Sequence, residues 1–181
     1  MDIWDQVVKN SKNEDVSLDY CKNKVVLVVN TALGSDYRAQ YLALEKLYRT
    51  YHDLGLEILD FPCNQFGNES DFPDEAIHEY CVKKFHTSFD QFKKVEVNGK
   101  EESPVFSFLK DNSPEETVNG FKNRSVMKSL KARSDTCKRQ GDVVWNYTKF
   151  LIDKKGDVVM RYATTENPML MEEKIKELLA K

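Results

Sequence analysis

The side chains that can act as nucleophiles, redox groups or metal ligands are sparse in this sequence. The four cysteines are far apart along the chain: Cys21, Cys63, Cys81 and Cys137. Neither a Cys-x-x-Cys redox pair nor the paired spacing of zinc ligands is present, so we predict no metal site. The three histidines lie on separate segments without the signature of a Ser-His-Asp triad. Thiols in this arrangement favour a reduced compartment over a disulfide framework.

The surroundings of three cysteines predict different accessibilities. Cys81 shares a four-residue repeat with Ile77 and Phe85, which places it on the apolar stripe of a helix, where a cysteine commonly fills core space. Cys63 follows a predicted strand, so we expect it to be buried. Cys137 has basic neighbours on both sides, and we expect it to be the exposed thiol with a lowered pKa.

The charge of the chain is acidic overall but basic in one segment. The formal net charge of −3 provides no overall attraction to nucleic acid or to an anionic membrane. Positive side chains are concentrated in the segment 112–142: Lys122, Arg124, Lys128, Lys131, Arg133, Lys138 and Arg139. This pattern is typical of a solvated helical face, and the alternative is a docking surface for an anionic partner. No aromatic interleaving indicates nucleic acid binding.

Size and hydropathy limit the architecture. A chain of 181 residues that is 40% hydrophobic fits one globular domain over residues 1–181. No stretch approaches the roughly 20 apolar residues needed to cross a bilayer. The sequence starts with acidic residues, where a secretory signal would be basic and then apolar. We therefore expect no transmembrane segment and a cytoplasmic location.

A βαβ unit is predicted near the start of the chain. Residues 24–30 form a β-branched, continuously apolar run, typical of a strand that is covered on both faces. Apolar residues from Tyr37 to Tyr51 then recur at steps of four and three, which predicts a helix that ends near Gly55. Residues 56–61 give the next strand. Ser35 would lie at the N-terminus of this first long helix, where a serine commonly caps a backbone N–H.

The remaining elements complete an α/β pattern. We expect a helix after Pro73, a short strand at 95–97, a helix from Ser103-Pro104, an amphipathic helix within 112–142, a hairpin over 149–162 and a last helix after Asn167-Pro168. These elements describe a central mixed β-sheet flanked by helices on both faces. The predicted fold is thioredoxin-like.

Several separate motifs together make the sequence resemble the glutathione peroxidase family. In the order of that family they are Ile3-Trp4-Asp5, Val16-Ser17-Leu18, Lys24 to Asn30, Phe61 to Gly67, Val97-Asn98-Gly99 and Trp145 to Asp153. The resemblance implies thiol-dependent reduction of hydrogen peroxide or organic hydroperoxides. It also implies a reductant such as glutathione or a thioredoxin-like protein as co-substrate, and no further cofactor. Glutathione or an acidic redox protein would fit the basic segment.

Two of the four catalytic positions of that family are changed here. In the family a cysteine or selenocysteine at the start of the first long helix attacks the peroxide, supported by a glutamine, a tryptophan and an asparagine. By resemblance the nucleophile's position falls on Ser35 and the glutamine's on Glu69, while Trp145 and Asn146 match the other two. In addition, Asp36 replaces the glycine that usually follows the nucleophile.

These changes oppose peroxide chemistry. A serine hydroxyl cannot become the sulfenic or selenenic acid through which the reaction passes. The carboxylate of Glu69 would repel a thiolate and raise its pKa. We therefore expect little or no peroxide turnover. Ser35 is also not expected to act as the nucleophile of a hydrolase, because the sequence shows no base positioned to activate it. By resemblance Cys81 occupies the position of the resolving cysteine, but without a thiol at residue 35 core filling is the preferred interpretation.

Three interpretations stay open at this point. The chain is a diverged, inactive peroxidase, a binding or regulatory module derived from one, or an engineered Ser form of an active enzyme. The change at Glu69 favours natural divergence, because a designed knock-out would need only the change at residue 35. A redox role for Cys81 or Cys137 is a further alternative.

Overall fold

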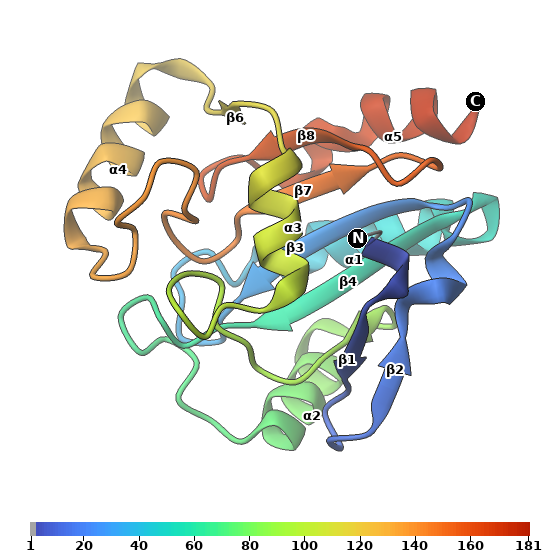
Figure 1. The fold of residues 1–181 in the computed structure, drawn as a ribbon, viewed down its shortest axis with the longest axis horizontal. Coiled ribbons are helices and arrows are strands. Elements are labelled where there is room, and N and C mark those ends of the chain that lie inside the picture. Colours follow the sequence, from blue (N-terminus) through green and yellow to red (C-terminus); the bar gives the residue numbers. More distant parts are fainter. Residues whose placement is uncertain (1–2) are drawn as a thin grey trace.

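The computed structural model describes residues 3–181, and a six-stranded mixed sheet forms its centre (Figure 1). The strand order is β5-β4-β3-β7-β8-β6. Their bounds are β3 Val25–Thr31, β4 Leu56–Pro62, β5 Asp90–Gln91, β6 Glu116–Thr117, β7 Lys149–Ile152 and β8 Val158–Tyr162. Strands β3 and β4 run parallel, whereas β7 is antiparallel to both β3 and β8. A separate hairpin pairs β1 Val7–Lys9 with β2 Asp15–Ser17.

The two central strands are apolar because helices cover both faces of the sheet. Every residue of β3 and β4 is buried. One core contains the inner faces of α1 Gln40–Tyr51, α2 Asp74–Phe85 and α5 Glu172–Leu179. The other contains the inner faces of α3 Pro104–Asn112 and α4 Gly120–Arg133. Short 3-10 helices lie at Ile3–Asp5, Leu18–Cys21, His52–Leu54 and Pro168–Met171.

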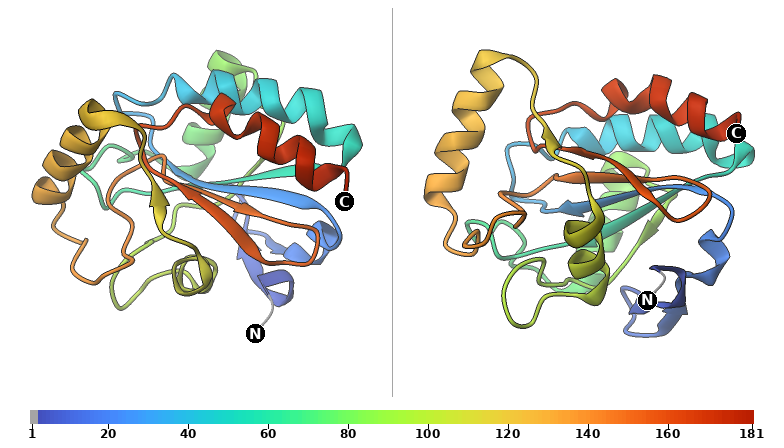
Figure 2. Two further views of the ribbon diagram at one scale, coloured as in Figure 1. Left: turned by 90° about the horizontal axis from the view of Figure 1, so that it is seen from above. Right: turned by 45° about the horizontal axis from the view of Figure 1, so that its top comes forward.

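The views in Figure 2 show the layers that result. Helices α1 and α5 lie side by side over one face of the sheet, and α3 lies across the other face. The basic helix α4 stands at one end of the molecule (Figures 1 and 2). Among the described residues, no helix has the length and apolarity required to cross a membrane.

The predicted βαβ unit, α2, the hairpin of β7 and β8 and the last helix are confirmed. Two predictions about secondary structure are wrong. Residues 95–97 form no strand, because the Val97 N–H donates to the side chain of Gln65 and only Glu96 forms a single bridge, to Glu102. Helix α1 begins at Gln40, five residues after Ser35, because residues 35–39 form turns instead.

Candidate functional site

Ser35 lies in the turn that connects β3 to α1 and is 1% exposed. Its Oγ accepts the backbone N–H of Tyr37 at 3.2 Å. The N-cap of α1 is instead Ala39, which has no side-chain cap. The expectation that Ser35 caps the long helix is therefore corrected: the hydroxyl caps the preceding turn, because a serine side chain readily bonds a backbone N–H two residues on.

Gly34 brings the Ser35 turn against the loop that carries Glu69. Its N–H donates to the carbonyl oxygen of Glu69 at 2.7 Å. A Cβ at position 34 would lie 2.8 Å from that same oxygen, closer than real Cβ atoms come. Only glycine therefore permits this approach of the two backbones. Glu69 itself is half-buried.

Asn146 and Trp145 meet the Glu69 side chain from the other side. The Asn146 Nδ2 donates to Glu69 Oε2 at 2.9 Å, and Asn146 has no exposed surface. Trp145 and Glu69 both lie against Gly67, since a Cβ built there would be 3.5 Å from Trp145 Cζ2 and 3.6 Å from Glu69 Cγ. The structure thus brings Glu69, Trp145 and Asn146 together, with Ser35 one residue from the Gly34 contact.

The face of Trp145 is covered by the end of the basic helix. The Arg133 guanidinium lies 5.1 Å from the centre of the Trp145 ring, a cation–π geometry, and the Phe66 ring lies at 5.5 Å. Trp145 is 3% exposed. Its indole N–H donates no hydrogen bond to any residue that the structure describes. That donor is therefore unpaired within residues 3–181.

The loop 145–148 is fixed by Asn30, the penultimate residue of β3. The Asn30 Nδ2 donates to the Trp145 carbonyl at 3.3 Å, and its Oδ1 accepts the Thr148 N–H at 3.1 Å. The Asn30 carbonyl accepts the Tyr147 N–H at 2.6 Å. These bonds hold Tyr147 at a φ of 65°, an uncommon value for a residue with a side chain. Nothing in the local sequence around Asn30 marks it as part of the site, because its partners lie more than 100 residues away.

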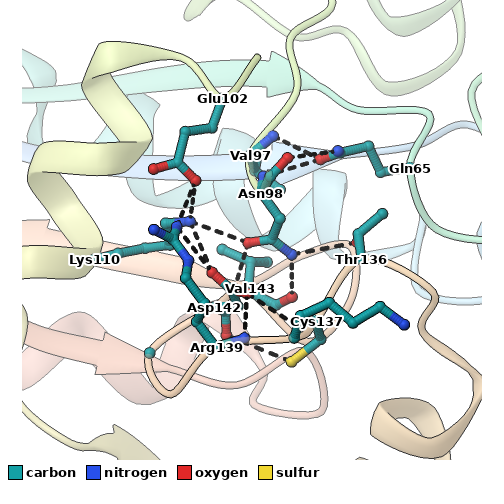
Figure 3. A network of polar contacts seen from close by, with 12 residues as sticks. Gln65, Val97, Asn98, Glu102, Lys110, Thr136, Cys137, Arg139, Asp142 and Val143 are labelled. Atoms are coloured by element: carbon teal, nitrogen blue, oxygen red, sulfur yellow. Dashed lines mark hydrogen bonds and ion pairs between the residues drawn. The ribbon is translucent and has the colours of Figure 1, made fainter. Parts of the chain in front are cut away.

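A second asparagine, Asn98, fixes the segment that enters this loop (Figure 3). Its Nδ2 donates to the Val143 carbonyl at 2.8 Å, and its Oδ1 accepts the Val143 N–H at 2.9 Å. Lys110 Nζ contacts Asn98 Oδ1 at 3.3 Å and pairs with both Glu102 and Asp142. Burial raises the pKa of Glu102, but the hydrogen bond and charge of Lys110 outweigh it and the net pKa is lowered.

The motif of residues 61–67 is connected to the same network. Gln65 Oε1 accepts the N–H groups of Val97 and Asn98, and Asn64 Oδ1 accepts the Ser70 N–H. The side chains of Asn64 and Gln65 therefore shape their loops through bonds to backbone groups. This is why three motifs far apart in the sequence occur together: they hold one another in place around Trp145 and Asn146.

Lys149 follows the loop and carries a charge into the protein interior. It is 0% exposed, and its Nζ donates to Gln40 Oε1 at 2.8 Å and to the Glu166 carbonyl at 2.6 Å. Burial lowers the pKa of Lys149 to about 7, although nearby carboxylates oppose the shift. The lysine thus joins the first residue of α1 to the segment after β8.

Three of the four thiols are buried. Cys81 is fully buried, and burial raises the pKa of its thiol to about 12. The same holds for Cys63 and Cys21. Cys137 is the only partly exposed cysteine, as predicted, but its pKa is raised by burial, so the expectation of a lowered pKa is wrong. The nearby cations do not outweigh its desolvation.

Cys81 belongs to a buried polar cluster around Asp60. Thr31, Tyr41 and Gln91 all donate to the carboxylate of Asp60. The Gln91 Nε2 also lies 3.4 Å from Cys81 Sγ. Burial raises the pKa of Asp60 to about 6, although its three donors lower it. No local sequence pattern predicts this cluster, because its members come from five separate elements.

The Ser35 hydroxyl is not an activated nucleophile. Among the described residues, the Ser35 hydroxyl has one hydrogen-bond partner, the Tyr37 N–H, and no histidine contacts it. A serine without a base remains a weak nucleophile at neutral pH. The carboxylate of the site, Glu69, already accepts the amide of Asn146.

Comparisons with known proteins agree with the geometry. The sequence profile of the family described as Glutathione peroxidase matches residues 3–110. The chain is 41% identical over 179 residues to a "Glutathione peroxidase" of Lactococcus lactis subsp. cremoris, covering 99% of this chain and 100% of that protein. The crystal structure of Trgpx in its apo form superposes with a TM-score of 0.70 at 29% identity, covering 100% of this chain and 97% of the other.

A more distantly related structure shares the fold, and at its low identity it bears on the fold only. A thiol:disulfide interchange protein of the thioredoxin family from Chlorobium tepidum aligns at a TM-score of 0.60 with 11% identity, covering 96% of this chain and 92% of that one. The α/β thioredoxin-like fold is therefore confirmed.

Proposed function

Because this chain belongs to the glutathione peroxidase family, we propose that it keeps the peroxidase scaffold but does not turn over hydroperoxides. The observation that supports this most directly is the hydroxyl of Ser35 at the nucleophile's position, where it caps a turn. Membership of the family supports thiol-dependent peroxide reduction as the ancestral reaction, with a thiol such as glutathione or a thioredoxin-like protein as reductant.

The proposed loss of activity follows from the electron balance of that reaction. A thiolate attacks one peroxide oxygen, the O–O bond breaks, and the other oxygen leaves as an alkoxide or hydroxide that takes up a proton. The sulfur is oxidised by two electrons to a sulfenic acid, which thiols then reduce. The oxygen of Ser35 has no comparable oxidation state to enter, so this route is closed.

Glu69 acts in the same direction. Its carboxylate accepts the amide of Asn146, a donor that would otherwise be available to an anion at residue 35. A carboxylate close to a thiol disfavours the thiolate and so raises the thiol pKa. Even with sulfur at position 35, we therefore expect Glu69 to reduce the fraction of thiolate at neutral pH.

The retained framework favours a binding or regulatory role as the second candidate. The hydrogen bonds of Asn30 and Asn98 still hold Trp145 and Asn146 in place, and the indole N–H is available for a ligand. In this proposal the single domain acts in the cytoplasm, and Cys81 fills the core. A partner would be recognised at this site without being chemically changed.

The test is a peroxide assay coupled to glutathione and, separately, to a thioredoxin system. Wild-type protein should show only background turnover. Ser35→Cys should show weak activity, and Ser35→Cys with Glu69→Gln should be faster by about tenfold or more, because the neutral amide no longer raises the thiol pKa. The rate of iodoacetamide alkylation against pH gives that thiol pKa directly.

Two controls make the outcome specific. Ser35→Cys with Glu75→Gln removes an exposed carboxylate on α2 and should behave like Ser35→Cys alone. Adding Cys81→Ser to the double variant tests whether a resolving thiol contributes. Wild-type turnover clearly above background would refute the proposal. Equal thiol pKa values in Ser35→Cys with and without Glu69→Gln would refute the role of the carboxylate.

A further inference from the structure

The helix α4 concentrates positive charge in an acidic chain. It contains five cations and no carboxylate: Lys122, Arg124, Lys128, Lys131 and Arg133. The whole chain has 27 basic and 30 acidic side chains, so without these five the remainder has 22 and 30, a net charge of −8. The protein is therefore strongly asymmetric in charge.

These cations are not neutralised within the protein. All five are exposed, and none forms an ion pair with any carboxylate of residues 3–181. Only Arg133 has a described partner, the ring of Trp145. Arg139, in the same segment but outside α4, is different, since it pairs with Glu102 and Asp142.

Contacts at its base and inner face hold α4 in one orientation. Met127 and Leu130 are buried against the core. The buried carboxylate of Glu166 accepts the Asn119 N–H at 2.9 Å and the Asn123 amide at 3.1 Å. An anion at a helix N-terminus is a stabilising arrangement. The outer face is consequently presented to the surroundings, at one end of the molecule (Figure 2).

An aromatic side chain projects from that outer face. Phe121 is 88% exposed, the most exposed large apolar residue of the described chain. It is the second residue of α4 and lies in the first turn of the helix. At 100° per residue, Lys122 and Arg133 fall on one flank of Phe121, and Arg124, Lys128 and Lys131 on the other. The cations thus lie on both sides of one protruding ring.

We propose that α4 docks the protein on a bilayer surface that contains anionic lipid headgroups. A plane of negative charge can reach the cations on both flanks at once, while Phe121 enters the boundary between headgroups and acyl chains. The rest of the chain has a net charge of −8 and is repelled by the same surface. We therefore expect the end of the molecule that carries α4 to face the bilayer.

Docking through α4 also has a consequence for the candidate site. Arg133 is the last residue of the same helix and lies over Trp145. A bilayer in contact with α4 would therefore be next to the loop that carries Trp145 and Asn146. This inference rests on charge and exposure alone and does not depend on whether the site turns over.

The test is flotation of the full chain with vesicles of phosphatidylcholine alone or mixed with phosphatidylserine. Binding should require phosphatidylserine and should weaken as salt is raised. Since each basic residue near an anionic surface contributes about a fivefold gain in affinity, Lys122→Gln, Arg124→Gln and Lys128→Gln together should weaken binding by roughly a hundredfold. The matched control replaces three exposed lysines of α1 and α2, Lys46→Gln, Lys83→Gln and Lys84→Gln, and should leave binding unchanged.

A spectroscopic readout reports on Phe121 directly. The fluorescence of Phe121→Trp should shift to shorter wavelength with phosphatidylserine vesicles and remain unshifted with phosphatidylcholine. Absence of binding to anionic vesicles would overturn the proposal, as would equal loss in the α4 and control triple variants. Binding of poly-glutamate that depends on α4, without binding to vesicles, would also overturn it, in favour of an acidic protein partner.

Discussion

The buried carboxylate of Asp60 provides a quantitative test of the polar cluster that it forms with Thr31, Tyr41 and Gln91. Burial raises the pKa of Asp60 from 3.8 to about 6. The folded protein therefore holds the proton more tightly than the unfolded chain does. Below pH 3.8 both states are protonated. Between pH 3.8 and 6 the unfolded chain ionises first, so the free energy of unfolding falls as pH rises, and above pH 6 the loss is complete.

The magnitude follows from the size of the shift. Two pKa units correspond to about 3 kcal/mol at 1.36 kcal/mol per unit. Asp60→Asn cannot ionise and should not lose this stability. The amide also has a partner available, because Gln91 Oε1 is buried without one and can accept a hydrogen bond if the Gln91 amide turns over. The free energy of unfolding of Asp60→Asn relative to wild type should thus rise by about 2 kcal/mol between pH 4 and pH 8, because roughly a fifth of the total effect already lies below pH 4.

Urea unfolding of both proteins across this pH range, followed by tryptophan fluorescence, measures the difference directly. Any constant cost of the substitution cancels, because only the change with pH is compared. Asp53→Asn, at an exposed position on the 3-10 helix after α1, is the matched control and should give a curve parallel to wild type. A parallel curve for Asp60→Asn would refute the assignment of the shift to Asp60.

Three further outcomes are expected. Burial lowers the pKa of Lys149 from 10.5 to about 7, so its charge destabilises the fold below pH 7 and this penalty disappears as pH rises toward 10.5. The difference in free energy of unfolding between Lys149→Met and wild type should therefore favour the variant more at pH 6 than at pH 10. A difference that is independent of pH would contradict this. Only Cys137 should react with a thiol reagent in the native state, because the other three cysteines are buried; mass spectrometry of labelled peptides checks it, and rapid labelling of Cys81 would count against the structure. Gly34→Ala should cost about 1–3 kcal/mol in urea unfolding, because the new Cβ meets the Glu69 carbonyl at 2.8 Å; an unchanged midpoint would show that the two loops can move apart.

The parts of the fold that could be predicted are those in which local pattern and tertiary burial agree. The apolar run of β3 and the repeat of Ile77, Cys81 and Phe85 are buried as expected. The turn between β7 and β8 is also local, since Asp153 Oδ1 accepts two N–H groups within four residues and Gly156 has a φ of 92°. In each case the information lies within one segment.

The predictions that are wrong concern segments whose partners lie elsewhere. Residues 95–97 have the composition of a strand, but their backbone groups bond to Pro62 and to the side chain of Gln65. The apolar spacing that begins at Tyr37 starts in the turns before α1, which begins only at Gln40. Consecutive turns can space side chains much as a helix does, so the spacing alone does not fix where the helix begins. Asn30 and Asn98 could not be recognised, since they bond to residues 115 and 45 positions away.

Ser35 and Glu69 are physically consistent with each other, which bears on how the proposed loss of activity is built. Ser35 adds no charge to the site, and Asn146 gives the half-buried carboxylate of Glu69 a hydrogen bond. A thiolate at residue 35 would add a second anion and would need the same amide. Ser35 and Glu69 therefore both favour a site without an anionic nucleophile. The contacts of Gly34, Asn30 and Asn98 do not involve the side chain of residue 35. Restoring sulfur alone should consequently give a weakly reactive thiol, and only the paired change should restore a site in which every donor faces an anion.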